Sequence, residues 1–106
     1  MKLALDFYCG KLGFEISSRD FFPCLVPLEH EGIHLVLSEV KLPASIRYGD
    51  AAQSLINFQT ENLSKTISDL KLKGVEFIHD FPQECPVGVF AAFKDSSGNV
   101  HEFVEF

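Results

Sequence analysis

The chain has 106 residues, which gives room for one domain and one hydrophobic core, near the small end of what is stable. Hydrophobic residues make up 46% of it, which excludes a disordered chain, and no apolar run reaches the length of a membrane span. The net charge of −6 argues against nucleic acid as a partner, because phosphate binding needs clustered Lys and Arg, and there is no basic face for an anionic membrane.

The cysteines indicate the compartment. Cys9, Cys24 and Cys85 are odd in number and share no C-x-x-C spacing. This pattern is typical of free thiols in a reducing environment, not of a disulfide framework or a zinc knuckle. The early charges of Lys2 and Asp6 do not fit a secretory signal. We therefore expect a cytoplasmic protein.

The first half of the chain predicts one helix and three strands. Apolar residues at three- and four-residue spacing predict a helix over residues 2–11, which Gly13 ends because glycine adopts a left-handed backbone at little cost. Strand-like runs follow at about 14–19, 21–28 and 33–39. Residues 41–52 are the long connection that we interpret as a linker.

The second half predicts the same elements with one more strand at its start. A strand at about 54–60 leads to a helix that Asn62 caps and that ends at Lys73, just before Gly74. Further strands are predicted at about 75–79, 87–94 and 100–105, the last two joined by turn-forming residues 95–99. The predicted order is αβββ followed by βαβββ.

The two halves also share sequence. Residues 3–16 and 66–78 each pass from helical spacing through a glycine into a strand, with Gly13-Phe-Glu-Ile in the first and Gly74-Val-Glu-Phe in the second. The halves close on the related stretches Gly32-Ile-His-Leu-Val-Leu and Gly98-Asn-Val-His-Glu-Phe-Val. Such duplication predicts one domain over residues 1–106, built from module one (1–40), the linker (41–52) and module two (53–106), with a cleft where the modules meet.

Three motifs resemble one known family. Ala4-x-x-Phe7-Tyr8-x-x-x-Leu12-Gly13-Phe14 resembles the A-x-x-F-Y-x-x-x-L-G-F signature of the vicinal oxygen chelate superfamily, which includes glyoxalases, bleomycin-resistance proteins and extradiol dioxygenases. Asp95-x-x-Gly98-Asn99-x-x-Glu102 is similar to its closing motif, and Gly74-Val-Glu-Phe fits the middle. The resemblance covers essentially the whole chain. It implies an α+β fold of paired βαβββ modules whose mixed sheet curls around a ligand cleft, here with the first strand of module one missing or truncated.

The resemblance also suggests metal ligands. Family enzymes draw them from the first and last strands of each module, and Glu102 occupies the position of the family's carboxylate ligand. His34 is the matching residue of module one in the repeat, so the two are expected to face one another across the cleft. A catalytic divalent ion needs about three protein ligands and an open position. The first strand of module two offers no histidine, so the ligand set is incomplete and we expect no cofactor; a divalent Zn, Ni, Mn or Fe ion at His34 and Glu102 is the alternative.

Other residues have weaker signals. Arg47 and Tyr48, in the linker, are predicted to contact an anionic or planar ligand. Strand alternation directs His101 away from the face of Glu102 and towards a helix. His79 is expected in solvent, and Cys9 has no neighbour that would activate it as a nucleophile. The sequence assigns no catalytic residue.

Two functions follow. The first is a metal-free protein that sequesters a small, partly aromatic ligand between its modules, with His34, Glu102, Arg47 and Tyr48 as orienting groups; the 11 phenylalanines supply apolar surface. The alternative is a metal-dependent lyase, isomerase or dioxygenase resembling glyoxalase I, so whether the chain is an enzyme stays open. The missing strand would leave an unpaired sheet edge, which predicts a homodimer.

Overall fold

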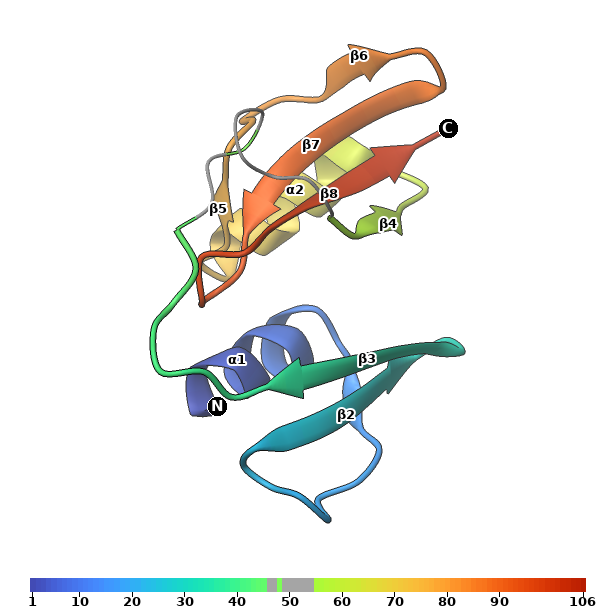
Figure 1. Cartoon of the computed structure of the whole chain (residues 1–106). Helices are drawn as coiled ribbons and strands as arrows, with labels where there is room; N and C mark the ends of the chain where they lie inside the picture. The colour runs from blue at the N-terminus through green and yellow to red at the C-terminus, as the bar shows by residue number, and fades with distance from the viewer. Residues whose placement is uncertain (46–47, 49–54) are drawn as a thin grey trace. The chain divides into compact units, whose positions relative to one another are not determined.

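The structure is a computed structural model that describes residues 1–45, 48 and 55–106 (Figure 1). The chain forms two compact units, Met1–Pro43 and Ala44–Phe106. The boundary between them falls within the predicted linker, residues 41–52. In the described ranges, no helix is both long enough and apolar enough to cross a membrane.

The first unit combines a helical segment with a three-stranded antiparallel sheet. Its sheet has the strand order β1-β2-β3. The elements are α1 (Lys2–Leu5), the π-helical turn η1 (Asp6–Lys11), β1 (Glu15–Ile16), β2 (Leu25–His30) and β3 (Ile33–Ser38). The core side chains are apolar or aromatic and come from helix and sheet alike: Phe7, Tyr8, Phe14, Val26 and Leu28.

Strand β3 has two different faces. Leu35 and Leu37 are half-buried, whereas His34 and Val36 between them are exposed. His34 pairs with Glu29 across the hairpin. The alternation confirms the strand predicted at 33–39 and places His34 on the exposed face of this unit's sheet.

Two of the predictions for the first unit need correction. The helix occupies its predicted range, but its second half is wound as a π-helix, in which the Leu12 amide donates to the Phe7 carbonyl at 3.1 Å. The strand predicted at 21–28 is wrong over its first four residues. A turn that includes the cis peptide Phe22-Pro23 is closed by the Leu25 amide on the Phe21 carbonyl at 3.1 Å, so β2 begins only at Leu25.

The second unit has the predicted βαβββ order with one added strand. In its five-stranded sheet, β4 pairs in parallel with β8, β8 and β5 pair antiparallel with β7, and β6 pairs with β7 off the main path. Helix α2 lies against one face of this sheet (Figure 1). The elements are β4 (Asn57–Gln59), α2 (Leu63–Leu72), β5 (Glu76–Phe77), β6 (Gln83–Cys85), β7 (Gly88–Lys94) and β8 (Val100–Glu105).

Helix α2 begins where the sequence predicts because its N-terminal cap forms. The Asn62 side-chain oxygen accepts the Lys65 amide at 3.0 Å, and Glu105 accepts the Leu63 amide at 2.7 Å. These bonds satisfy backbone donors that a helix start leaves free. The Glu105 bond also ties α2 to the end of β8.

An aromatic cluster fills the space between sheet and helix. Phe93 is completely buried, and its ring stacks on Phe103 at 4.8 Å and contacts Phe58 and Phe77 at 6.1 and 5.8 Å. Their layer is completed by the buried helix residues Leu63, Ile67 and Leu70. We call this side of the sheet the helix face and the opposite side the pocket face.

His101 lies buried on the helix face, as alternation predicts. Its Nδ1 atom accepts the Ile56 amide at 3.4 Å, and its ring lies 5.7 Å from that of Phe93. Burial lowers the pKa of His101, and the attraction of Asp95 opposes part of that shift. The folded state therefore prefers the neutral imidazole.

Acid should destabilise the protein through His101. Because its folded pKa lies below the ordinary value of 6.5, the stabilisation is present above that value and is lost as the pH falls through the folded pKa. We expect urea unfolding to show a smaller loss of stability between about pH 7.5 and pH 5 in His101→Asn, whose amide oxygen can accept from Ile56 without titrating. An unchanged pH slope would contradict this role.

Candidate functional site

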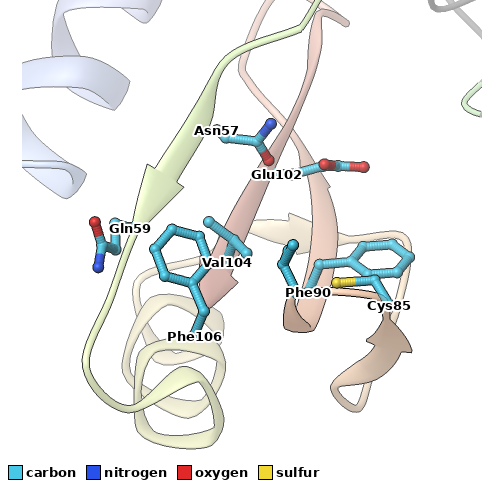
Figure 2. A pocket seen from close by; sticks show the side chains of 8 residues that line it. Asn57, Gln59, Cys85, Phe90, Glu102, Val104 and Phe106 are labelled. Carbon is cyan, nitrogen blue, oxygen red and sulfur yellow. The ribbon is translucent and has the colours of Figure 1, made fainter.

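A pocket of about 430 Å³ lies on the pocket face of the second unit (Figure 2). Strands β4, β6, β7 and β8 contribute to its wall. Most of the lining is apolar, with one thiol: Cys85, Val87, Phe90, Val104 and Phe106. The polar lining consists of two amides and one carboxylate: Asn57, Gln59 and Glu102.

Strand pairing brings these side chains to one face. Asn57 pairs with Glu102, and Val104 has Gln59 on one side and Phe90 on the other. Because paired residues of adjacent strands point to the same side, alternate positions of three strands line the pocket. Asn57 and Glu102 lie next to one another at one end of it (Figure 2).

Tyr48 is hydrogen-bonded to that polar end, although it is not one of the residues that line the pocket. Its hydroxyl donates a hydrogen bond to the Glu102 carboxylate. Burial, and then the bond to Glu102 and that carboxylate's charge, raise the pKa of Tyr48 to about 12. At neutral pH the side chain is therefore a neutral phenol whose proton is committed to Glu102. The structure thus brings together two of the four residues predicted to bind ligand.

The ring of His79 packs against the ring of Tyr48. The rings meet edge to face at 5.4 Å, and His79 meets Phe90 in the same way at 5.3 Å. Its Nδ1 atom accepts the Ala92 amide at 3.0 Å, which places the ring proton on Nε2. The prediction that His79 lies in solvent is wrong. The side chain is half-buried by its contacts with β7, which the local sequence does not reveal.

The other two predicted ligand-binding residues are in different situations. His34 is exposed on β3 of the first unit, and Arg47 lies outside the described residues. Their predicted roles, and the predicted pairing of His34 with Glu102, stay predictions. The sequence reasoning missed Asn57 and Gln59, although both flank the apolar Phe58 in a predicted strand, which is the alternation expected of a polar face.

The described surroundings of Glu102 do not fit a catalytic metal. A divalent catalytic ion needs about three protein ligands. Residues 1–45, 48 and 55–106 contain no group of three or more His, Cys, Asp or Glu side chains that could hold an ion. The amide of Asn57 lies beside Glu102, and one oxygen of the Glu102 carboxylate accepts a hydrogen bond from the Tyr48 hydroxyl. We therefore derive no metal-dependent step.

Two further sequence features have structural explanations. Asp95 holds the turn of the closing motif, because one carboxylate oxygen accepts the amides of Ser97 and Asn99 at 2.9 and 2.8 Å. Burial raises the pKa of the Cys9 thiol, with Arg19 opposing, so this cysteine is not activated. Both outcomes agree with the sequence analysis.

Titrating Tyr48 tests the polar end of the pocket. We expect its phenolate absorbance to appear at about pH 12, and at lower pH in Glu102→Gln, since the repulsion of a phenolate by the carboxylate is lost and the new amide can donate to the phenolate. The proton that the fold retains contributes stability that disappears as the pH rises from 10.0 through about 12. Subtracting the titration of Tyr48→Phe removes the signal of Tyr8. Identical curves for wild type and Glu102→Gln would refute the contact.

Comparisons with known proteins agree with these features. The family model of the Glyoxalase/Bleomycin resistance protein/Dioxygenase superfamily matches residues 1–103. The uncharacterised protein YetH of Bacillus subtilis (strain 168) is 29% identical over 92% of this chain and 82% of its own.

Solved structures show the same α+β fold with two sheets. A glyoxalase family protein from Enterococcus faecalis superposes with a TM-score of 0.79 at 20% identity, covering 97% of this chain and 86% of that one. TnmS3, an antibiotic-binding protein from Streptomyces sp. CB03234, gives 0.71 at 23% identity, covering 98% and 84%. The chain belongs to the glyoxalase/bleomycin resistance protein/dioxygenase superfamily.

Proposed function

We propose that this protein binds a small, partly aromatic molecule in the pocket of its second unit, without a metal ion. The observation that carries the proposal is the pocket itself: apolar walls around about 430 Å³, with three polar side chains, two of which, Asn57 and Glu102, are paired on adjacent strands. Small-molecule sites have this balance, since apolar contact supplies affinity and placed polar groups supply orientation.

The apolar and the polar side chains of the pocket have different roles in binding. Phe90, Val104 and Phe106 remove apolar ligand surface from water, which contributes about 25 cal/mol for each Å² buried. Glu102, with Tyr48 bonded to it, fixes the orientation of a polar group on the ligand. The bond to Tyr48 also fixes the carboxylate in advance, so less conformational entropy is lost on binding.

The relatives support a binding role at the level of the fold. TnmS3 is an antibiotic-binding protein, so a protein of this fold can bind an antibiotic. The metal-dependent alternative requires ligands in addition to Glu102, and the described residues around it supply an amide and a phenol. The binding function is therefore the one that the described contacts favour.

A pocket-filling variant tests the proposal. Hits from a thermal-shift screen of partly aromatic compounds would be titrated by calorimetry into EDTA-treated wild type, Gln59→Trp and Ser68→Trp. Gln59 is an exposed residue of the pocket, and Ser68 is an exposed residue of α2. We expect Gln59→Trp to weaken binding by at least about tenfold and Ser68→Trp to leave it unchanged. Hits that bind both variants equally would place the site elsewhere.

We also propose that the protein is a homodimer joined at the edge of β3. In the second unit the last strand, β8, has β4 on its outer side, whereas in the first unit β3 ends the described sheet. An unpaired edge offers backbone donors and acceptors to a second chain. Sedimentation velocity at about 50 μM should then show a dimer. A clean monomer would rule this assembly out.

A further inference from the structure

We infer that the ligand of this pocket is a flat aromatic cation that brings its own hydrogen-bond donors, such as an aryl amine, amidine or guanidine, and not a carboxylate or phosphate. This inference rests on the proposed binding function. It concerns the chemistry of the polar end, where Glu102, Tyr48 and Asn57 meet.

The polar end is rich in acceptors. An ionised carboxylate accepts hydrogen bonds and donates none. The phenol in contact with this end, Tyr48, already donates its proton to Glu102, so it offers a ligand no donor. Asn57, beside Glu102, offers both a donor and an acceptor. A ligand that satisfies this end must therefore supply N–H or O–H groups.

Charge favours the same class. The described residues that line the pocket include a carboxylate and two amides but no Lys, Arg or His. Lys94 lies on the same face of β7, two residues after Ala92, the partner of Glu102. Its Nζ atom, however, is 3.5 Å from the carboxylate of Glu76 on the neighbouring strand β5. A ligand carboxylate would meet Glu102 as a like charge, whereas a cation would form a charge-assisted hydrogen bond.

The apolar wall suits a flat ring. Phe90 and Phe106 line the pocket together with Val104, which pairs with Phe90 and precedes Phe106 by two residues. Aromatic faces attract a cation that has lost part of its water, in addition to the apolar area that they bury. A charged, planar ring system uses both the wall and the polar end, while an aliphatic ammonium uses mainly the second.

Three probes of similar outline and different charge test the inference: 9-aminoacridine, a cation at neutral pH; acridone, which is neutral; and anthracene-9-carboxylate. Fluorescence titrations would be made on wild type, Glu102→Gln and Asp69→Asn, which removes a carboxylate from α2. We expect 9-aminoacridine to bind wild type and Asp69→Asn at least about tenfold more tightly than acridone, with the anion weakest. Glu102→Gln should abolish the preference while retaining acridone binding.

A salt series keeps the test independent of any variant. Raising NaCl from about 20 to about 300 mM should weaken binding of 9-aminoacridine and leave acridone unchanged, since salt screens only the charged contact. If all three probes bind equally, are insensitive to salt and are weakened by Gln59→Trp, the proposed function stands and the cation inference is overturned. If no probe binds, or Gln59→Trp weakens none of them, both are overturned.

Discussion

Replacing Phe93 with alanine should lower the free energy of unfolding by about 3–5 kcal/mol. The ring is fully buried on the helix face and contacts three other phenylalanines, the nearest, Phe103, at 4.8 Å. Its removal loses the transfer free energy of the ring and leaves a cavity that the packed strands cannot close. Since domains of this size have about 5–15 kcal/mol of stability, this loss is a large fraction of the total.

Urea unfolding followed by circular dichroism measures the effect, and Phe81→Ala is its matched control. Phe81 is 76% exposed, so the same change there should cost less than about 0.5 kcal/mol. Comparable losses for the two variants would mean that the aromatic cluster is not the core of the second unit.

Gly98→Ala should have the second large effect, about 3 kcal/mol or more, for two separate reasons. The backbone at Gly98 has a φ of +85°, which costs a residue with a Cβ atom roughly 1–2 kcal/mol. In addition, a Cβ atom there would lie 2.0 Å from the carbonyl oxygen of Ala44, which is backbone and moves only with its segment. The Ala44 amide donates to Ser97 at 2.7 Å, so moving it disturbs the turn as well.

Substitutions at two other glycines distinguish the cost of the backbone conformation from the cost of the contact with Ala44. Gly13 has a φ of +87° but nothing within 4 Å of an added Cβ atom, so Gly13→Ala should cost only the backbone term. Gly10 also has open space, and its helical position should make Gly10→Ala neutral or stabilising by about 0.5–1 kcal/mol. In thermal unfolding, the melting temperature should be lowest for Gly98→Ala, intermediate for Gly13→Ala and highest for Gly10→Ala. A Gly98→Ala variant as stable as Gly13→Ala would remove the contact with Ala44 from the explanation.

Much of the fold was predictable because its signals are local or repeated. The Asn62 cap, the alternation of β3 and the Asp95 turn each depend on residues within a few positions of one another. The family motifs then indicated the fold of paired βαβββ modules. Strand β6 was not predicted, because its residues, between Pro82 and Pro86, show no apolar alternation. They form a strand only through their pairing with β7.

The candidate site was predictable only in part, for a physical reason. Glu102 came from a motif, but its partner Tyr48 lies 54 positions away, and no local pattern specifies a hydrogen bond of that range. His79 likewise takes its environment from Phe90 and Ala92. Alternation indicates which side of a strand a residue occupies, whereas the contacts on that side are set by the packing of the whole unit.

The parallel pairing of β4 with β8 has an evolutionary consequence. It sets position 57 directly beside Glu102 on the first strand of the unit, one of the strands from which the resemblance to metal-dependent enzymes predicts a ligand. The codons for asparagine and histidine differ in one base, so a single mutation at Asn57 would put an imidazole next to the carboxylate. That pair is still short of the roughly three protein ligands that a catalytic ion needs, so metal chemistry on this scaffold would require at least one further substitution. The same architecture can thus serve binding proteins and enzymes that differ at a few strand positions.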